Sequence, residues 1–78
     1  MSHADEIRAL VAAIARAPLP EAPEASLFEA GVIDSFGVVE LVARLEEAFG
    51  IQVPDADLVP RKFETLARIA AYVDARRS

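Results

Sequence analysis

The chain has 78 residues, 54% of them hydrophobic, and a formal charge of −5, which suits one folded domain over residues 1–78 and excludes a disordered chain. It contains no cysteine, which excludes a disulfide framework, a cysteine zinc site and a cysteine nucleophile. No secretory signal is recognisable and no apolar run approaches the roughly 18–20 residues that cross a bilayer, so we expect a cytoplasmic protein without membrane insertion.

The first predicted helix begins near the N-terminus with a capping pattern, in which Ser2 is followed three residues later by Asp5. An apolar stripe then repeats at positions i, i+3, i+4 and i+7, through Ile7, Leu10, Val11 and Ile14. The run should end at Ala17-Pro18, because the residue before a proline is disfavoured in the α region. These signals predict one amphipathic helix.

A long connection over residues 18–34 follows and contains three prolines. Because compact domains rarely carry a slack loop of this length, we expect it to be held against the core. The segment Ser26–Glu29 is typical of a one-turn capped helix, with Gly31 at its end. The apolar residues of this loop that we expect to dock in the core are Leu27, Phe28, Val32 and Ile33.

Helical signals resume at Asp34 and Ser35, which are both favoured caps. They predict a second helix over residues 36–49, with Gly50 as its stop. A short segment over residues 54–59, closed by Pro60, then predicts a brief helix of about one turn.

The last predicted helix is capped by Thr65 and ends in Arg76 and Arg77, which suit the negative end of a helix dipole. Its apolar face consists of Leu66, Ile69, Ala70 and Val73. No strand alternation is found. The predicted fold class is therefore all-α: a four-helix bundle with three main helices, one short helix and a long first loop.

The second helix carries apolar side chains on two of its sides. At about 100° per residue, its core side consists of Val38, Leu41, Val42, Leu45, Ala48 and Phe49. The opposite side carries Phe36, Val39, Glu40, Ala43, Arg44 and Glu47. Either Phe36 folds back onto the preceding loop and Val39 is an ordinary exposed residue, or the two form an apolar patch rimmed by acids that docks a basic partner.

Acidic residues are concentrated around this helix. Nine acids and a single base, Arg44, lie between Glu21 and Asp57, whereas five bases and two acids follow from Arg61 onward. An acidic middle repels nucleic acid and anionic membranes, and it attracts basic protein surfaces. We therefore expect protein partners and no nucleic acid.

Taken alone, Asp34-Ser35 before a helix is usually only a cap. No histidine is placed to activate Ser35, because the single His3 lies near the N-terminus. There is no glycine-rich phosphate loop and no Cys/His metal spacing, and Asp55 and Asp57 fit a cap and a solvated loop better than a metal site. The residue types predict neither a catalytic nor a metal site.

The strings around Ser35 change this interpretation. They are GVIDSFGVVELV over residues 31–42 and LEEAFGIQVPD over residues 45–55. These strings strongly resemble the acyl carrier protein family, and the resemblance extends from the first helix to Val73. It implies a four-helix bundle whose motif serine carries 4′-phosphopantetheine, transferred from coenzyme A by a separate Mg²⁺-dependent transferase. Ser35 would be the attachment residue and Asp34 the acid beside it.

The resemblance also implies a monomeric carrier, not an enzyme, that holds an acyl or aminoacyl group as a thioester. Its implied partners are a phosphopantetheinyl transferase, an acyl- or aminoacyl-adenylating ligase and downstream acyl-transfer enzymes. The implied docking surface on the second helix consists of Phe36, Val39, Glu40, Ala43 and Glu47. Two residues depart from the family pattern: Ala43 stands where many relatives have a larger apolar residue, and Arg44 interrupts an otherwise acidic helix.

For the cargo, the run from Gly31 to Gly37 is closer to the D-alanyl carrier proteins and similar free-standing carriers than to other members. It lacks the paired glycines of peptidyl carrier domains, and Phe36 replaces the leucine common in fatty-acid carriers. This favours a small, exposed amino or carboxylic acid over the cargo of a generic fatty-acid or polyketide carrier.

Two other function classes stay open from the sequence. One is a helical protein-interaction module without a prosthetic group, in which Ser35 is only a cap. The other is a small helix-turn-helix nucleic-acid binder, which the acidic middle of the chain argues against.

Overall fold

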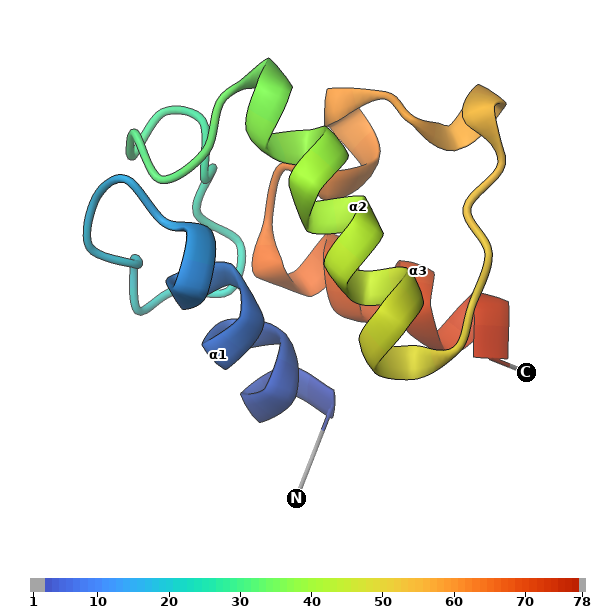
Figure 1. Ribbon diagram of the computed structural model, residues 1–78. Coiled ribbons are helices and arrows are strands. Elements are labelled where there is room, and N and C mark those ends of the chain that lie inside the picture. Colours follow the sequence, from blue (N-terminus) through green and yellow to red (C-terminus); the bar gives the residue numbers. More distant parts are fainter. Residues whose placement is uncertain (1–2, 78) are drawn as a thin grey trace.

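The computed structural model describes residues 3–77, and all regular structure in this part of the chain is helical. Three α-helices, α1 (His3–Ile14), α2 (Ser35–Phe49) and α3 (Leu66–Arg77), are accompanied by two 3₁₀ turns, η1 (Asp55–Asp57) and η2 (Pro60–Phe63). Each α-helix packs against the other two, and η2 packs against α2 and α3. In Figure 1, α3 lies behind α2, and the long loop over residues 18–34 lies at the end of the bundle where α1 stops and α2 begins. The all-α fold is confirmed.

The segment between α2 and α3 differs from the sequence prediction. The brief helix expected over residues 54–59 is the single 3₁₀ turn η1, and Pro60 begins η2 instead of closing the segment. Proline suits the first position of a helical turn, because its ring imposes the required φ and its missing N–H would have no partner there. The fourth element of the bundle is therefore a pair of 3₁₀ turns.

The first helix also ends earlier than predicted, at Ile14 and not at Ala17-Pro18. The backbone N–H of Arg16 donates to the carbonyl of Val32 at 2.9 Å, and the chain has left the helix by that point. The predicted cap at Ser2 lies outside the described residues. In the part of the chain that the structure covers, no helix is long and apolar enough to span a membrane.

The hydrophobic core takes side chains from all three helices and from the loops. Its buried members are Ile7, Val11, Leu27, Val32, Ile33, Val38, Leu41, Val42, Leu45, Ile51, Val53, Phe63, Leu66, Ile69 and Val73. The predicted docking of the long loop is confirmed, since Leu27, Val32 and Ile33 are buried and Phe28 is half-buried against them.

Hydrogen bonds fix the backbone of the long loop to the start of α3. The Leu27 N–H donates to the carbonyl of Glu64 at 2.7 Å, and the Ala67 N–H donates to the carbonyl of Pro23 at 3.0 Å. The predicted one-turn helix at Ser26–Glu29 is a turn, in which Ser26 still accepts the Glu29 N–H at 3.2 Å. The loop therefore holds the start of α2 in a defined place relative to α3.

Candidate functional site

Asp34 and Ser35, at the start of α2, have different structural roles. Asp34 is the N-cap, with an extended backbone, and its Oδ1 accepts the Gly37 N–H at 2.8 Å. Ser35 is the first helical residue and is exposed. Both residues are favoured caps by type, but Asp34 alone caps the helix. The hydroxyl of Ser35 is consequently not needed for capping.

Four hydroxyl side chains lie within residues 3–77, and three of them have structural partners. Ser26 and Thr65 accept backbone N–H groups at 3.2 and 3.0 Å, which confirms Thr65 as the cap of α3. The Tyr72 hydroxyl donates to the carboxylate of Asp57 at 2.7 Å. Ser35 forms no hydrogen bond through its hydroxyl with any residue of the described range. Among the described hydroxyls, it is the one that is both exposed and free to react.

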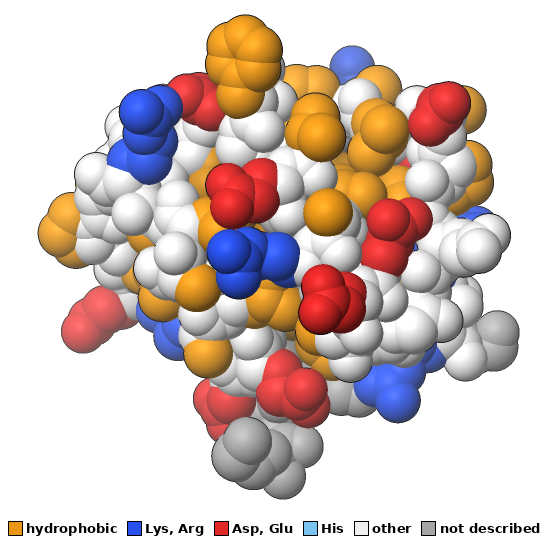
Figure 2. All heavy atoms as spheres, viewed as in Figure 1, with side chains coloured by type: hydrophobic (Ala, Val, Ile, Leu, Met, Phe, Trp, Pro, Cys, Tyr) orange, Lys and Arg blue, Asp and Glu red, His pale blue; other side chains and the backbone are white. Residues whose placement is uncertain are grey.

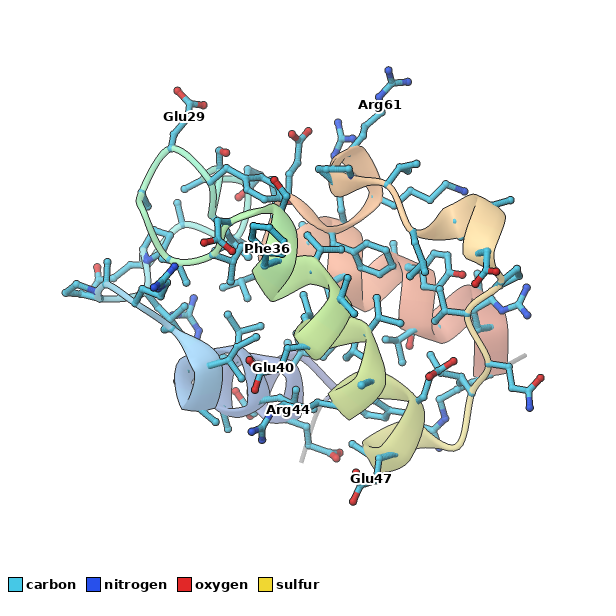
Figure 3. The ribbon with its side chains drawn as sticks, turned by 45° about the horizontal axis from the view of Figure 1, so that its top comes forward. Glu29, Phe36, Glu40, Arg44, Glu47 and Arg61 are labelled. Carbon is cyan, nitrogen blue, oxygen red and sulfur yellow. The ribbon has the colours of Figure 1, made fainter. Side chains whose placement is uncertain are left out.

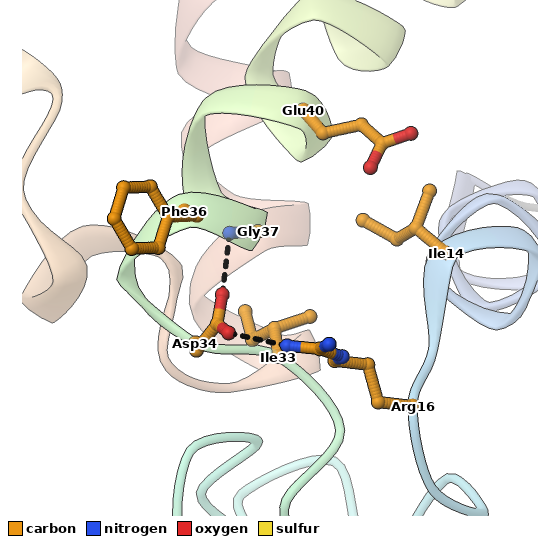
Figure 4. Close-up of a pocket in the computed structure, with 7 residues that line it drawn as sticks. All are labelled: Ile14, Arg16, Ile33, Asp34, Phe36, Gly37 and Glu40. Carbon is orange, nitrogen blue, oxygen red and sulfur yellow. Dashed lines mark hydrogen bonds and ion pairs between the residues drawn. The ribbon is translucent and has the colours of Figure 1, made fainter.

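Arg16 contributes to this site, although the sequence pattern did not indicate it. Its guanidinium contacts Oδ2 of Asp34 at 2.6 Å, while Oδ1 of the same carboxylate binds Gly37 (Figure 4). The guanidinium remains largely exposed. Because 18 positions separate Arg16 from Asp34, only the path of the long loop brings them together.

An open pocket of about 320 Å³ lies between the end of α1 and the start of α2. Its lining, shown in Figure 4, consists of Ile14, Arg16, Ile33, Asp34, Phe36, Gly37 and Glu40. Gly37 permits the close approach of α2 to the loop here, because a Cβ on Gly37 would lie 3.2 Å from the Cβ of Ile33. Apolar and charged side chains thus line the pocket together.

The carboxyl of Asp34 has a lowered pKa. The main cause is the hydrogen bond from the Gly37 N–H, and the positive charge of Arg16 acts in the same direction. Asp34 thus stays ionised at neutral pH, and Arg16 partly balances its charge.

We expect the charge of Asp34 to make stability pH-dependent. Its folded-state pKa lies below the ordinary value of 3.8, so the carboxylate stabilises the fold above that value, and the contribution disappears as the pH falls through the folded pKa. Asp34→Asn keeps an oxygen acceptor for the Gly37 N–H but removes the charge. Wild type should melt at a higher temperature than Asp34→Asn near neutral pH, and the difference should shrink as the pH falls from neutral to well below 3.8. Other acids titrate in both proteins, so a difference that stays constant over this range would contradict the prediction.

The exposed side of α2 matches its prediction. Phe36 is 86% exposed and Val39 is 62% exposed, so the alternative in which Phe36 folds back onto the loop is wrong. Ala43 is also exposed, as are Glu40, Arg44 and Glu47, which lie along the same side of the helix in Figure 3. Figure 2 shows that apolar and acidic side chains lie close together on this face of the molecule. Glu40 and Arg44 form an ion pair at 3.5 Å, which partly offsets the charge of Glu40.

The core side of α2 differs from its prediction at one residue, Ala48. Val38, Leu41, Val42 and Leu45 are buried and Phe49 is half-buried, as predicted, but Ala48 is exposed. Ala48 lies at the border of the core side, beside Leu10, Arg44 and Glu47 in a surface depression. The neighbouring Glu46 and Glu47 differ from each other in their surroundings. Glu46 accepts the Val53 N–H at 2.9 Å, whereas Glu47 is exposed.

A second polar cluster was missed on the other side of the bundle. Asp57, expected in a solvated loop, accepts the Tyr72 hydroxyl at 2.7 Å and pairs with Lys62 at 3.0 Å. Burial, followed by the bond to Asp57, raises the pKa of Tyr72 to about 12, and that same bond is the main reason why the pKa of Asp57 is lowered. No group of metal-ligating side chains is found within residues 3–77. The carboxylate of Asp57 therefore joins the 3₁₀ turns to α3.

Comparison with known proteins identifies the class of this molecule. The family described as "Phosphopantetheine attachment site" matches residues 5–73, nearly the whole chain. The chain belongs to this carrier family. The carrier is 40% identical over 50 residues to D-alanyl carrier protein 2 of Lactiplantibacillus plantarum, an alignment that covers 64% of this chain and 62% of the relative. It is 39% identical over 54 residues to the D-alanyl carrier protein of Streptococcus pyogenes serotype M1, covering 69% of this chain and 68% of the relative.

The prosthetic group of the carrier is 4′-phosphopantetheine, held covalently. The start of α2 fits such a group. It offers an exposed hydroxyl without a partner in the described chain, next to an open pocket and at the positive end of a helix. Arg16 adds a cation to this end of the molecule, where a phosphodiester would add negative charge beside Asp34.

Proposed function

We propose that Ser35 is the residue that carries 4′-phosphopantetheine, and that the protein presents an acyl or aminoacyl group to partner enzymes. The observation that carries this assignment is the state of the hydroxyl groups: Ser35 alone among those described is exposed and has no structural partner. When bound, the prosthetic group supplies the thiol that this cysteine-free chain lacks.

The residues around Ser35 keep the attachment point rigid. Asp34 holds the first turn of α2 through Gly37, and Arg16 holds Asp34. Arg16 is itself fixed by its N–H bond to Val32 in the loop. A flexible group on Ser35 would therefore start from a fixed position, and its mobility would come from the group and not from the protein.

We assign partner docking to the exposed side of α2, through Phe36, Val39, Glu40, Ala43 and Glu47. Apolar side chains rimmed by acids suit an apolar hollow surrounded by bases, and the charges speed the encounter of the two proteins. The partners in this proposal are a phosphopantetheinyl transferase, an adenylating ligase and downstream acyl-transfer enzymes. The carrier itself catalyses no reaction and acts as a cytoplasmic monomer.

The cargo in this proposal is a small amino or carboxylic acid. The relatives described above are named D-alanyl carrier proteins, which makes an amino acid the first candidate.

The wild-type protein provides the direct test. Incubation with coenzyme A and a broad-specificity phosphopantetheinyl transferase should add the mass of one phosphopantetheine, and peptide mapping should place it on Ser35. An unchanged intact mass would reject the carrier function of this chain and favour the protein-interaction module.

A further inference from the structure

Phe63 is the largest of the fully buried side chains in the described core. It ends η2, which packs against both α2 and α3. Its ring meets the ring of Tyr72 in an edge-to-face arrangement, with centroids 5.2 Å apart and planes inclined by 62°. The ring of Phe63 is therefore buried against α3, on a turn that also packs against α2.

The turn that carries Phe63 packs against the helix that begins with the proposed attachment residue. Figure 1 shows η2, drawn in orange, next to the start of α2, which begins with Ser35. An apolar chain that is tethered at Ser35 and enters the bundle on this side meets the place that Phe63 fills. Since protein interiors have few voids larger than a water molecule, the chain would have to displace the ring.

The surroundings hold Phe63 in this place. The carboxylate of Asp57 binds the Tyr72 hydroxyl at 2.7 Å and Lys62, the neighbour of Phe63, at 3.0 Å. Arg68 of α3 donates to the carbonyl of Arg61 at 3.1 Å. Moving the ring outward would break bonds that tie η2 to α3.

The other recess near Ser35 is unsuited to a long apolar chain. It is the pocket between α1 and α2, whose lining includes Arg16, Asp34 and Glu40. Burying an alkyl chain there would remove water from these charged groups without offering them new partners, and such desolvation is costly.

We infer that Phe63 is a specificity-determining residue: it closes the interior next to Ser35 and so keeps the cargo outside the protein. This inference rests on the proposed function of Ser35. It defines the cargo class as short acyl or aminoacyl groups, which need no apolar shelter.

The test compares acyl chains of increasing length, from acetyl to decanoyl, attached to the protein by transferase from the corresponding acyl-coenzyme A. The melting temperature is measured for wild type, Phe63→Ala, Phe63→Leu and the control Ile7→Ala, with loading checked by intact mass. Ile7 is equally buried but lies on α1, away from its Ser35 end. The melting temperatures of wild type and of Ile7→Ala should not depend on chain length. That of Ile7→Ala should be lower than that of wild type at every length. The melting temperature of Phe63→Ala should be low with the acetyl group and should rise by several degrees as the acyl chain lengthens, because the chain fills the new cavity.

A rise with chain length in wild type equal to that in Phe63→Ala would overturn the inference, as would a Phe63→Ala protein indifferent to length. Phe63→Leu leaves a smaller cavity and keeps the comparison decisive if the alanine variant does not fold. Free 1-octanol added to the unmodified proteins gives a test that does not depend on Ser35. It should raise the melting temperature of Phe63→Ala above that of its untreated form and leave wild type unchanged. Failure of loading alone would thus reject the role of Ser35, and an octanol effect equal in both proteins would reject that of Phe63.

Discussion

Ser35→Ala is expected to fold normally and to gain no mass when incubated with coenzyme A and a phosphopantetheinyl transferase. The variant removes the one described hydroxyl that is exposed and without a structural partner. Because Asp34 caps α2, the free energy of unfolding should stay within about 0.5 kcal/mol of wild type, as for an ordinary surface substitution. Intact mass spectrometry measures the modification, and thermal or denaturant unfolding measures the stability.

Ser26→Ala is the matched control for this experiment. It removes a hydroxyl that accepts the Glu29 N–H in the long loop, so it should cost some stability but still gain one phosphopantetheine. The two serine variants should therefore behave in opposite ways. Modification of Ser35→Ala at any other residue would refute the assignment.

Reversing the charge of Glu47 or Glu40 should slow the loading of the carrier by roughly tenfold at low ionic strength, because exposed charges steer the encounter with a basic partner. The effect should shrink as salt is added, since salt screens such charges. Glu47→Lys should act more strongly than Glu40→Lys, because Arg44 already offsets part of the Glu40 charge. Phe36→Ala should weaken binding to the transferase without lowering the melting temperature, since the ring is exposed. Initial rates of mass gain at several salt concentrations measure these effects.

Glu29→Lys is the control for the charge reversals. Glu29 is exposed on the long loop and points away from α2 (Figure 3), so the net charge changes equally while the docking surface is untouched. Its loading rate should stay close to that of wild type. If Glu29→Lys slows loading as much as Glu47→Lys, net charge and not the α2 surface controls the encounter.

Most of the fold follows from local signals in the sequence. Thr65 and Gly50 mark helix ends through their own chemistry, and the 3.6-residue period places Phe36 and Val39 opposite the core. The short helix over residues 54–59 corresponds to η1, but η2 was missed, because so short a segment has no period to read and a proline can either close one turn or open the next.

The polar contacts of the site were harder to foresee. Arg16 meets Asp34, and Asp57 meets Tyr72, only after separate elements have been assembled. Neither pair has the spacing of a helical neighbour, so no local rule connects its members. The motif predicted Asp34 and Ser35 as a pair, but the geometry was needed to tell the capping residue from the free hydroxyl.

We expect the bonds between the long loop and α3 to affect the order in which the carrier folds and is modified during synthesis. Leu27 and Pro23 are fixed by Glu64 and Ala67, which the ribosome adds much later. Contacts between such distant positions form late in folding, since a large loop must close first. A nascent chain that ends before α3 would thus carry Ser35 on a helix whose preceding loop is not yet held by Glu64 and Ala67, and we expect it to be a poorer transferase substrate than a chain that includes α3. The attachment of the prosthetic group would in this way follow the synthesis of α3, so that only carriers with an intact α3 are modified.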